Sequence, residues 1–537
     1  MANSIYEAFA QTVDRWPQRD MLQVLPATAN VYDIEAGTLS YRHVHEQVIS
    51  YSHRFEGAGY TQGMRVALLL ENRPVFFLIW LALNRLGVSV VPINPDLRTN
   101  ELSYLLSHAE PALVISISSR LIDLSKAVKQ ARFAVQVICV DDPLPSPRED
   151  SIVAEPLSGG EQEAAVLYTS GTTGNPKGCV LPNNYFLLAG QWYANVGGLA
   201  SLDNNGERMI TPLPVFHMNA MAYSFMAMVT IGGCLCVLDR FHPGSWWSSV
   251  RASDATCLHY LGVMPTLLMN APVSPDDQNH CVKFGFGAGI DPELHEAFET
   301  RFGFPLVEAW AMTETGAGAV VAASDKQRIV GQSCLGRPQP SIDCKLVDTN
   351  GLPVSTDQPG ELLVRHKGSN LRFGFFSKYY KNKKATEDAW RDEWFHTGDI
   401  VKQDAAGNLY FVDRKKNVIR RSGENIAAIE VESVLMRHPA VSAAAVTAVP
   451  DPLRGDEVFA CLKVDKPSTS LANDITQWCL SELAYYKAPG YIAFVDSLPL
   501  TATQKVQRAT LKAQAAQLLD DPATVNTTSL KRRQVAI

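Results

Sequence analysis

The stretch from Ala165 to Gly178 reads AVLYTSGTTGNPKG and runs from an apolar segment into a loop of hydroxyls, glycines and one lysine. The apolar segment is typical of a buried strand. Glycines let the backbone turn tightly, and successive N–H groups in such a turn form a concavity for anions. The stretch therefore predicts a strand followed by a loop that binds a polyphosphate. The candidate ligands are Thr169, Ser170, Gly171, Thr172, Thr173, Gly174 and Lys177.

Two other interpretations of this loop are weaker. A Walker A loop needs Ser or Thr after its lysine, and here Gly178 follows Lys177. A polar surface turn is the ordinary alternative, but ten such loop residues directly after a buried strand favour the phosphate site. The segment TSGTTGNPKG resembles the phosphate-loop signature of the adenylate-forming enzymes. That family includes acyl-CoA synthetases, nonribosomal adenylation domains and firefly-type luciferases, and the resemblance extends over nearly the whole chain.

Length and composition limit the class of protein. The chain has 537 residues, too many for one hydrophobic core, so two or more domains are expected. Its net charge of −7 argues against nucleic-acid binding, which needs a basic surface. The ten cysteines form no C-x-x-C pair, and the first residues show no secretory signal. We therefore expect a cytoplasmic protein without a zinc site or a disulfide framework.

The order of apolar segments indicates an α/β fold. Apolar runs at 66–70 and 88–93 flank a helical pattern at 74–86, and this alternation predicts parallel strands with covering helices. The apolar run at 221–238 is interrupted by Gly232. We interpret it as a buried helix, a turn and a buried strand, with a membrane span as the minor alternative.

The resemblance also implies a domain organisation. It predicts a large N-terminal α/β domain with several sheets, residues 1–414, that binds ATP and the carboxylate. A small C-terminal α+β domain, residues 417–537, carries the catalytic lysine. The two are joined by a hinge near Lys416.

A second motif, PLVEAWAMTETG at 305–316, runs from a strand into a polar turn. Thr313 can bond a phosphate oxygen. Glu314 offers an oxygen ligand for Mg²⁺, which binds through one carboxylate together with substrate phosphates and waters. The resemblance implies that the flat ring of Trp310 lies against adenine. It also adds Glu308 and Ala309 to the nucleotide-binding residues.

Asp399 closes a third motif, WFHTGD at 394–399. Its two carboxylate oxygens can accept bonds from both ribose hydroxyls, although an Asp in a tight turn is the plain alternative. By resemblance Arg414 also reaches the ribose or a phosphate. The resemblance places Gly287 and Ala288 beside adenine and the acyl group, where the alternative is close packing of backbones.

The C-terminal segment LPLTATQKV at 498–506 resembles the catalytic-lysine loop of the family. Leu500 replaces a basic residue and Gln504 replaces a glycine, but the spacing from Pro499 to Lys505 is intact. The resemblance implies that Lys505 bridges the carboxylate and the α-phosphate in the first step. After rotation about the hinge, the tunnel for the pantetheine arm of coenzyme A would be lined by Ser422, Gly423 and Glu424.

The carboxylate pocket is the least specified part of the site. His217 stands where domains that activate amino acids carry Asp, which lowers the prediction of an amino-acid substrate. By resemblance His217 also lies beside the ATP phosphates, and we count it with Lys505, Thr313 and Glu314 as catalytic. A bulky Trp and several Met among the candidate residues favour a small or medium acid over a very long chain. The candidate pocket residues are Phe216, His217, Met218, Val263, Met264, Ala288, Gly289, Ile290, Trp310 and Met312.

Together the motifs predict an ATP-dependent acyl-CoA ligase. The expected partners are ATP, Mg²⁺, coenzyme A and a small carboxylate, without nucleic acid and without a transmembrane segment. Two alternatives remain open. One is a stand-alone adenylating enzyme that loads an acyl carrier protein. The other is a degenerate nucleotide-binding protein.

Overall fold

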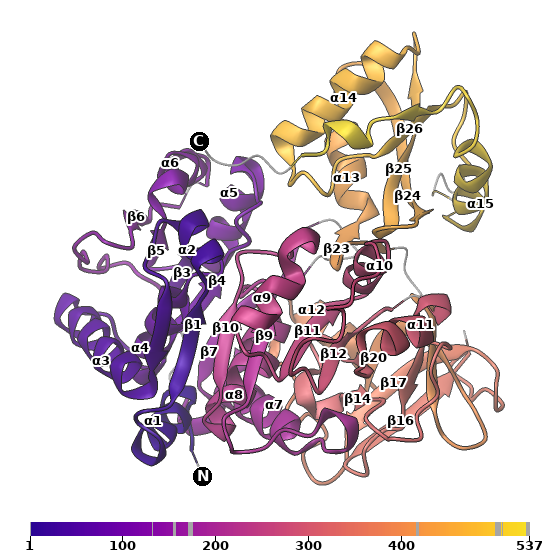
Figure 1. The fold of residues 1–537 in the computed structure, drawn as a ribbon. Coiled ribbons are helices and arrows are strands. Elements are labelled where there is room, and N and C mark those ends of the chain that lie inside the picture. Colours follow the sequence, from indigo (N-terminus) through magenta and orange to yellow (C-terminus); the bar gives the residue numbers. More distant parts are fainter. Residues whose placement is uncertain are drawn as a thin grey trace.

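The computed structural model describes residues 2–131, 133–153, 157–169, 175–290, 292–348, 350–414, 418–499, 506 and 508–532. Figure 1 shows a large N-terminal part built on three sheets, with a smaller C-terminal domain, orange to yellow, lying against it.

The first sheet has seven strands in the order β18-β8-β7-β4-β3-β5-β6. The five from β7 to β6 are parallel, and β8 and β18 extend one edge antiparallel. Side chains of β3 alternate between two cores, Val66 and Leu68 in one, Ala67 and Leu69 in the other. The predicted parallel unit is thus confirmed. Its elements are β3 (Arg65–Leu69), α4 (Pro74–Arg85), β4 (Ser89–Pro92), α5 (Thr99–Ala109), β5 (Leu113–Ser116), α6 (Leu121–Gln130), β6 (Gln136–Cys139), β7 (Glu163–Thr169), β8 (Lys177–Pro182) and β18 (Lys378–Tyr379).

The second sheet has eight strands in the order β14-β13-β12-β11-β9-β10-β1-β2. The six from β13 to β1 are parallel, and one antiparallel strand lies at each edge. The strands are β1 (Asp20–Val24), β2 (Gly37–Ser40), β9 (Arg208–Thr211), β10 (Cys234–Val237), β11 (Cys257–Leu261), β12 (Phe284–Ala288), β13 (Leu306–Trp310) and β14 (Val321–Ala322). The accompanying helices are α1 (Ile5–Arg15), α2 (Pro26–Tyr32), α3 (Tyr41–Ala58), α7 (Asn183–Asn195), α8 (Met226–Ile231), α9 (Trp246–Ala252), α10 (Val263–Met269) and α11 (Pro292–Phe302).

The apolar run at 221–238 forms the predicted helix, turn and strand. Helix α8 ends at Gly232, whose φ of 66° lies in the left-handed region that glycine tolerates, and β10 follows. A π-helix, η4 (Asn219–Phe225), precedes α8 and was not predicted. Among the described residues, no helix is long and apolar enough to cross a membrane.

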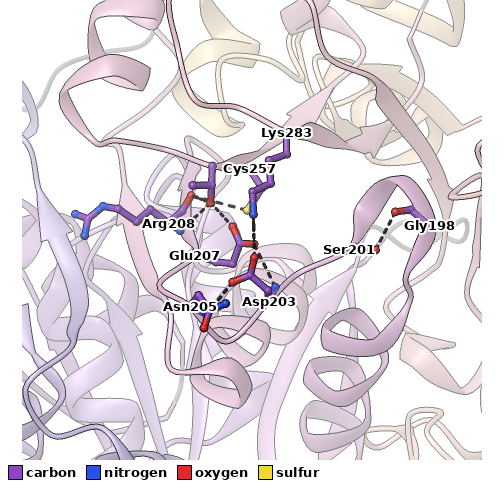
Figure 2. Close-up of polar contacts among 9 residues, drawn as sticks. Gly198, Ser201, Asp203, Asn205, Glu207, Arg208, Cys257 and Lys283 are labelled. Carbon is purple, nitrogen blue, oxygen red and sulfur yellow. Dashed lines mark hydrogen bonds and ion pairs between the residues drawn. The ribbon is translucent and has the colours of Figure 1, made fainter.

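The amino ends of β9, β11 and β12 are tied together by a polar cluster (Figure 2). Glu207, 2% exposed, accepts a hydrogen bond from Lys283 Nζ at 2.6 Å and another from Thr256. Asp203 lies 3.2 Å from the same ammonium. These bonds hold together the amino ends of the three strands. Ligands of parallel sheets bind at the opposite side, beyond the carboxyl ends of the strands.

We expect Lys283→Met to lower the free energy of unfolding by about 1–3 kcal/mol, because the buried Glu207 carboxylate loses its strongest donor. Urea unfolding measures the change. The matched control is Lys383→Met, at a lysine that is 90% exposed and 3.7 Å from Glu387, where no measurable change is expected. Equal effects of the two substitutions would contradict the structural role of the cluster.

The third sheet is antiparallel, in the order β15-β21-β20-β17-β16, with β19 paired to β20. It supplies the part of the chain that carries the predicted ribose contacts. Its elements are β15 (Cys334–Gly336), β16 (Ile342–Val347), β17 (Gly360–His366), α12 (Lys383–Ala389), β19 (Trp390–Arg391), β20 (Trp394–Gln403) and β21 (Leu409–Arg414).

The C-terminal domain has its own sheet, β23-β22-β25-β26-β27, with β24 paired to β25. Its hydrophobic clusters begin at Ile419, whereas the clusters of the large domain end at Phe411. Two separate cores support the predicted large and small domains. The elements are β22 (Val418–Arg421), β23 (Glu424–Ala427), α13 (Ala428–Leu435), β24 (Val441–Asp451), β25 (Gly455–Val464), α14 (Thr469–Glu482), β26 (Tyr491–Phe494), α15 (Arg508–Leu518) and β27 (Val525–Asn526).

Candidate active site

A cavity of about 710 Å³ lies at the carboxyl ends of β9, β11, β12 and β13. Strands β7 and β8, the third sheet and the β22–β23 turn of the C-terminal domain complete its wall. The cavity therefore brings together motifs that are far apart in the sequence. The predicted site residues on its wall are Thr169, Lys177, His217, Met218, Gly287, Ala288, Ala309, Met312, Thr313, Glu314 and Gly423.

Alternation separates the side chains of β13, whereas the four residues after the strand, Ala311 to Glu314, all line the wall. Within the strand Ala309 lines the wall, and its neighbours Glu308 and Trp310 do not. Successive side chains of a strand point to opposite faces, so these two lie on the other face. The sequence prediction counted Glu308, Ala309 and Trp310 together as nucleotide-binding residues, and the structure separates them.

Glu308 has a structural environment. Its carboxylate accepts hydrogen bonds from the Tyr260 hydroxyl at 2.8 Å and from the backbone N–H groups of Gly289 and Ile290 at 3.2 and 3.1 Å. Burial raises the pKa of Glu308, and the hydrogen bonds oppose that shift. Glu308 therefore holds the turn that follows β12. Its side chain does not line the cavity, where the sequence placed it among the nucleotide-binding residues.

Trp310 and Asp399 are paired with each other. The indole Nε1 donates to Asp399 Oδ2 at 2.9 Å, and both side chains are buried. Thr397 and Gly398, the neighbours of Asp399, line the cavity instead. The indole thus fixes one carboxylate oxygen, and the predicted contacts to adenine and ribose remain predictions.

Glu314 is anchored at the wall beside a lysine. It is 7% exposed, and its Oε1 accepts a hydrogen bond from the Tyr379 hydroxyl at 2.8 Å. Burial and the charge of Glu314 raise the pKa of Tyr379, which keeps the phenol a donor. Lys177 Nζ lies 4.7 Å from the centre of the Tyr379 ring. The ammonium of Lys177 and the carboxylate of Glu314 thus both lie beside Tyr379, in the part of the cavity that is predicted to bind phosphates.

The residues at this end fit a magnesium ion that is held jointly with phosphates. In the described ranges, no group of three or more His, Cys, Asp and Glu side chains could hold a metal ion. Mg²⁺ commonly takes one or two carboxylates and completes its shell with phosphate oxygens and waters. The single carboxylate of Glu314, oriented by Tyr379, matches that donor set.

The C-terminal domain reaches the cavity through the turn between β22 and β23. Ser422 and Gly423 have φ values of 50° and 86°. A Cβ added at Gly423 would lie 2.3 Å from Leu261 Cδ1, the end of a flexible side chain, and the positive φ of Gly423 itself favours glycine at this close approach to β11. Glu424 Oε1 is 3.4 Å from His217 Nε2. The predicted tunnel residues and the predicted catalytic histidine therefore meet across the two domains.

Other predicted pocket residues lie in the core. Met264 and Ile290 are buried in the cluster that includes Phe298, and neither lines the cavity. Helix α10 and the turn after β12 direct them to the rear of the sheet, which strand and helix spacing alone did not reveal.

At Gly287 a Cβ would meet the Tyr260 carbonyl oxygen at 2.2 Å, so packing against β11 already requires glycine.

The structure adds wall residues that the sequence did not single out. Asn219 and Tyr223 follow His217 closely in the chain, and His396 lies within the motif at 394–399. Closeness in sequence to a predicted site residue could therefore have indicated these three. No comparable signal marked Tyr379. Among the added wall residues are Asn219, Tyr223, Tyr260, Phe286, Tyr379, Lys384, Arg391, His396 and Arg420.

Several predicted residues lie outside the described residues. These are Ser170 to Gly174 of the phosphate loop, Lys416, and Lys505 with Leu500 and Gln504. Arg414 ends β21 and Val263 begins α10, but their side chains are not among the described ones. The roles predicted for all of these remain predictions.

A buried lysine links the two domains. Lys487 Nζ lies 2.6 Å from Glu101 Oε1 of α5 and 2.8 Å from Glu430 Oε1 of α13. Burial alone would lower the pKa of Lys487, but the charges of the two carboxylates outweigh it and raise the pKa. Asn94 adds a hydrogen bond to the Tyr486 hydroxyl at 2.9 Å. We call Lys487, Glu101 and Glu430 the interdomain triad.

Comparisons with known proteins agree with the domain order. The AMP-binding enzyme model matches residues 9–376, and the AMP-binding enzyme C-terminal domain model matches residues 430–505. The crotonobetaine/carnitine–CoA ligase of Salmonella paratyphi A is 28% identical over 491 residues, which cover 88% of this chain and 93% of the relative.

A solved structure of the o-succinylbenzoate CoA synthetase of Bacillus subtilis is also similar. Its double mutant, bound with the product analogue OSB-NCoA, is 25% identical, covers 96% of this chain and 99% of its own, and has a TM-score of 0.79. The same synthetase in complex with the acyl-adenylate intermediate OSB-AMP is 25% identical, covers 94% and 97%, and has a TM-score of 0.64.

Proposed function

The chain belongs to the AMP-binding enzyme family, and from that premise we propose that it is an ATP-dependent acyl-CoA ligase for a small or medium carboxylic acid. The carboxylate attacks the α-phosphate of Mg·ATP, giving an acyl-adenylate and pyrophosphate. The thiol of coenzyme A then attacks the acyl carbon, and AMP leaves. One observation carries the proposal: a single cavity joins Lys177, Thr313 and Glu314 with the Gly423 turn of the C-terminal domain.

The mixed charged and apolar lining of this cavity suits the two parts of an acyl-adenylate. A carboxylate and a triphosphate repel each other, so catalysis requires neutralised charge and fixed positions. Lys177 would neutralise charge directly. Glu314 would do so by holding a magnesium ion that also binds the phosphates. The same cavity is also lined by the apolar side chains of Leu213, Met218 and Phe286, which suit an acyl chain.

We assign the described domain arrangement to thioester formation. Support comes from the Gly423 turn at the cavity wall and from the higher TM-score to the synthetase bound with a CoA product analogue, 0.79 against 0.64 with the adenylate intermediate. In this proposal the domain boundary lies between residues 414 and 417. Rotation about Lys416 exchanges this arrangement for one in which Lys505 faces the α-phosphate.

A panel of carboxylates with ATP, Mg²⁺ and coenzyme A tests the proposal. We expect pyrophosphate release that depends on the acid, and an acyl-CoA product detected by mass spectrometry. Pyrophosphate release without an acyl-CoA product, together with loading of an added acyl carrier protein, would overturn the choice of acceptor. No pyrophosphate release with any acid would overturn the enzyme assignment.

Glu314→Gln should raise the Mg²⁺ concentration for half-maximal activity about tenfold or more and lower turnover, because the isosteric amide removes the anionic oxygen that a hard cation prefers. Magnesium titrations of pyrophosphate release measure both effects. Glu387→Gln, on the exposed face of α12, is the control and should not change the titration. An unchanged titration for Glu314→Gln would remove this residue from the metal site.

A further inference from the structure

Two wall residues of the cavity lie at the ends of neighbouring strands. Thr169 is the last residue of β7 and Lys177 is the first of β8, and both line the cavity. They are register partners in the antiparallel pair that these two strands form. The residues directly before them, Tyr168 and Pro176, do not line the cavity. Contacts that hold Tyr168 and Pro176 therefore also hold Thr169 and Lys177 at the wall.

Helix α5 contacts both strand ends from outside the cavity. The Tyr104 hydroxyl donates a hydrogen bond to the Pro176 carbonyl oxygen at 3.0 Å. His108 Nδ1 lies 2.7 Å from the Tyr168 hydroxyl. Tyr104 and His108 are four residues apart, which places them on one face of the helix, and their rings are stacked with centres 5.6 Å apart. One helix face thus holds both strand ends.

A second face of α5 fixes the helix to the same sheet. Its buried side chains belong to the hydrophobic cluster that also contains Val166 of β7 and Val180 of β8. Moving the helix away would expose these side chains to water, which is unfavourable. The hydrogen bonds to the strand ends therefore come from a helix that is itself anchored. The buried side chains of this face are Leu102, Leu105, Leu106 and Ala109.

The His108 contact joins two uncharged groups. Burial lowers the pKa of His108 and raises that of Tyr168, so at neutral pH the imidazole and the phenol are both neutral and share one hydrogen bond. His108 also lies edge-on to Tyr380, with ring centres 5.5 Å apart. The Tyr380 N–H donates to the Gly178 carbonyl oxygen at 2.7 Å. His108 therefore also supports β8, next to Lys177.

We propose that Tyr104 and His108 are positioning residues that hold Thr169 and Lys177 in place for the triphosphate of ATP. Neither Tyr104 nor His108 lines the cavity, so both act through the two strand ends. The inference rests on the proposed ligase function and adds two residues to its nucleotide site. A displaced Lys177 would attract the triphosphate less, so the loss should fall on ATP binding. Transfer from supplied acyl-AMP, which involves no triphosphate, should be unaffected.

Tyr104→Phe removes only the hydroxyl and is the first test. Calorimetry without an acid should show a Kd for Mg·ATP that is about three- to tenfold higher, the range expected for one hydrogen bond. The KM for ATP in pyrophosphate release should rise equally, with the KM for the acid and the transfer rate from acyl-AMP unchanged. Tyr60→Phe is the matched control, because the Tyr60 hydroxyl also donates to a proline carbonyl oxygen, that of Pro145 at 3.1 Å. An equal rise in Kd for the control would overturn the proposal.

The second test addresses His108. His108→Leu should raise the Kd for Mg·ATP about three- to tenfold, and His108→Asn should restore part of the loss, since its amide can replace Nδ1 in the hydrogen bond. Tyr168→Phe removes the other partner of that bond, so its effect should match that of His108→Leu and should not add to it. Should His108→Leu not fold, Tyr168→Phe carries the test.

An unchanged Kd for Mg·ATP in both Tyr104→Phe and Tyr168→Phe would overturn the positioning role. The calorimetric comparison needs no catalysis, so it decides this role even if no acid led to pyrophosphate release. That second outcome would overturn the ligase function alone.

Discussion

Lys505→Ala is expected to lower acyl-adenylate formation about 10²–10³-fold, while transfer of the acyl group from supplied acyl-AMP to coenzyme A is largely kept. The reason is that a cation placed against the developing charge on the carboxylate and the α-phosphate acts in the first step alone, and removal of one such electrostatic contact has this order of effect. The two half-reactions are measured on one preparation, the first by pyrophosphate release and the second by loss of acyl-AMP.

Lys463→Ala is the control for this substitution, because Lys463 is an exposed lysine of the same domain. Both of its half-reactions should match the wild type. Equal loss in the two half-reactions of Lys505→Ala would reject the division of work between two domain arrangements.

Lys487→Met should produce the opposite pattern. The substitution leaves Glu101 and Glu430 buried without their shared cation, and removing one partner of a buried ion pair typically costs about 3–5 kcal/mol. Glu101 belongs to the large domain and Glu430 to the small one, so part of this cost falls on the described domain arrangement. Thioester formation should fall by about a hundredfold, with adenylation largely kept.

The interdomain triad has an independent test in Tyr486→Phe, which removes only the hydrogen bond from Asn94. It should change the two half-reactions in the same direction as Lys487→Met, but less. Lys463→Met should change neither. If Lys487→Met reduced adenylation as strongly as thioester formation, the triad would be a general support of the fold and would not favour one arrangement.

Motif order was sufficient to predict a large and a small domain and part of the cavity wall. Thr313, Glu314, Gly287 and Lys177 lie on that wall because each is at or just beyond a strand end that meets the cavity. Polar residues and glycines at strand ends are visible in a sequence, so these positions could be found from it.

The direction in which an individual side chain points, toward the cavity or away from it, could not be predicted in the same way. Glu308 and Trp310 belong to a quoted motif but lie on the far face of β13, where Tyr260 and Asp399 bind them. The π-helix beginning at Asn219 changes the angular spacing that helical periodicity assumes, so that periodicity did not reveal that Asn219 and Tyr223 both line the cavity. Both outcomes depend on tertiary contacts that single-chain patterns do not contain.

The Gly423 turn completes the cavity from the second domain, and this makes binding and domain docking thermodynamically reciprocal. Any ligand that contacts both Gly423 and the large domain stabilises their docking by the same free energy by which docking strengthens its binding. A weakened interdomain triad must then appear as a weaker affinity for such a ligand, although the ligand never touches Lys487. Coenzyme A titrations of the Lys487 variant would report the strength of a contact on a different face of the domain.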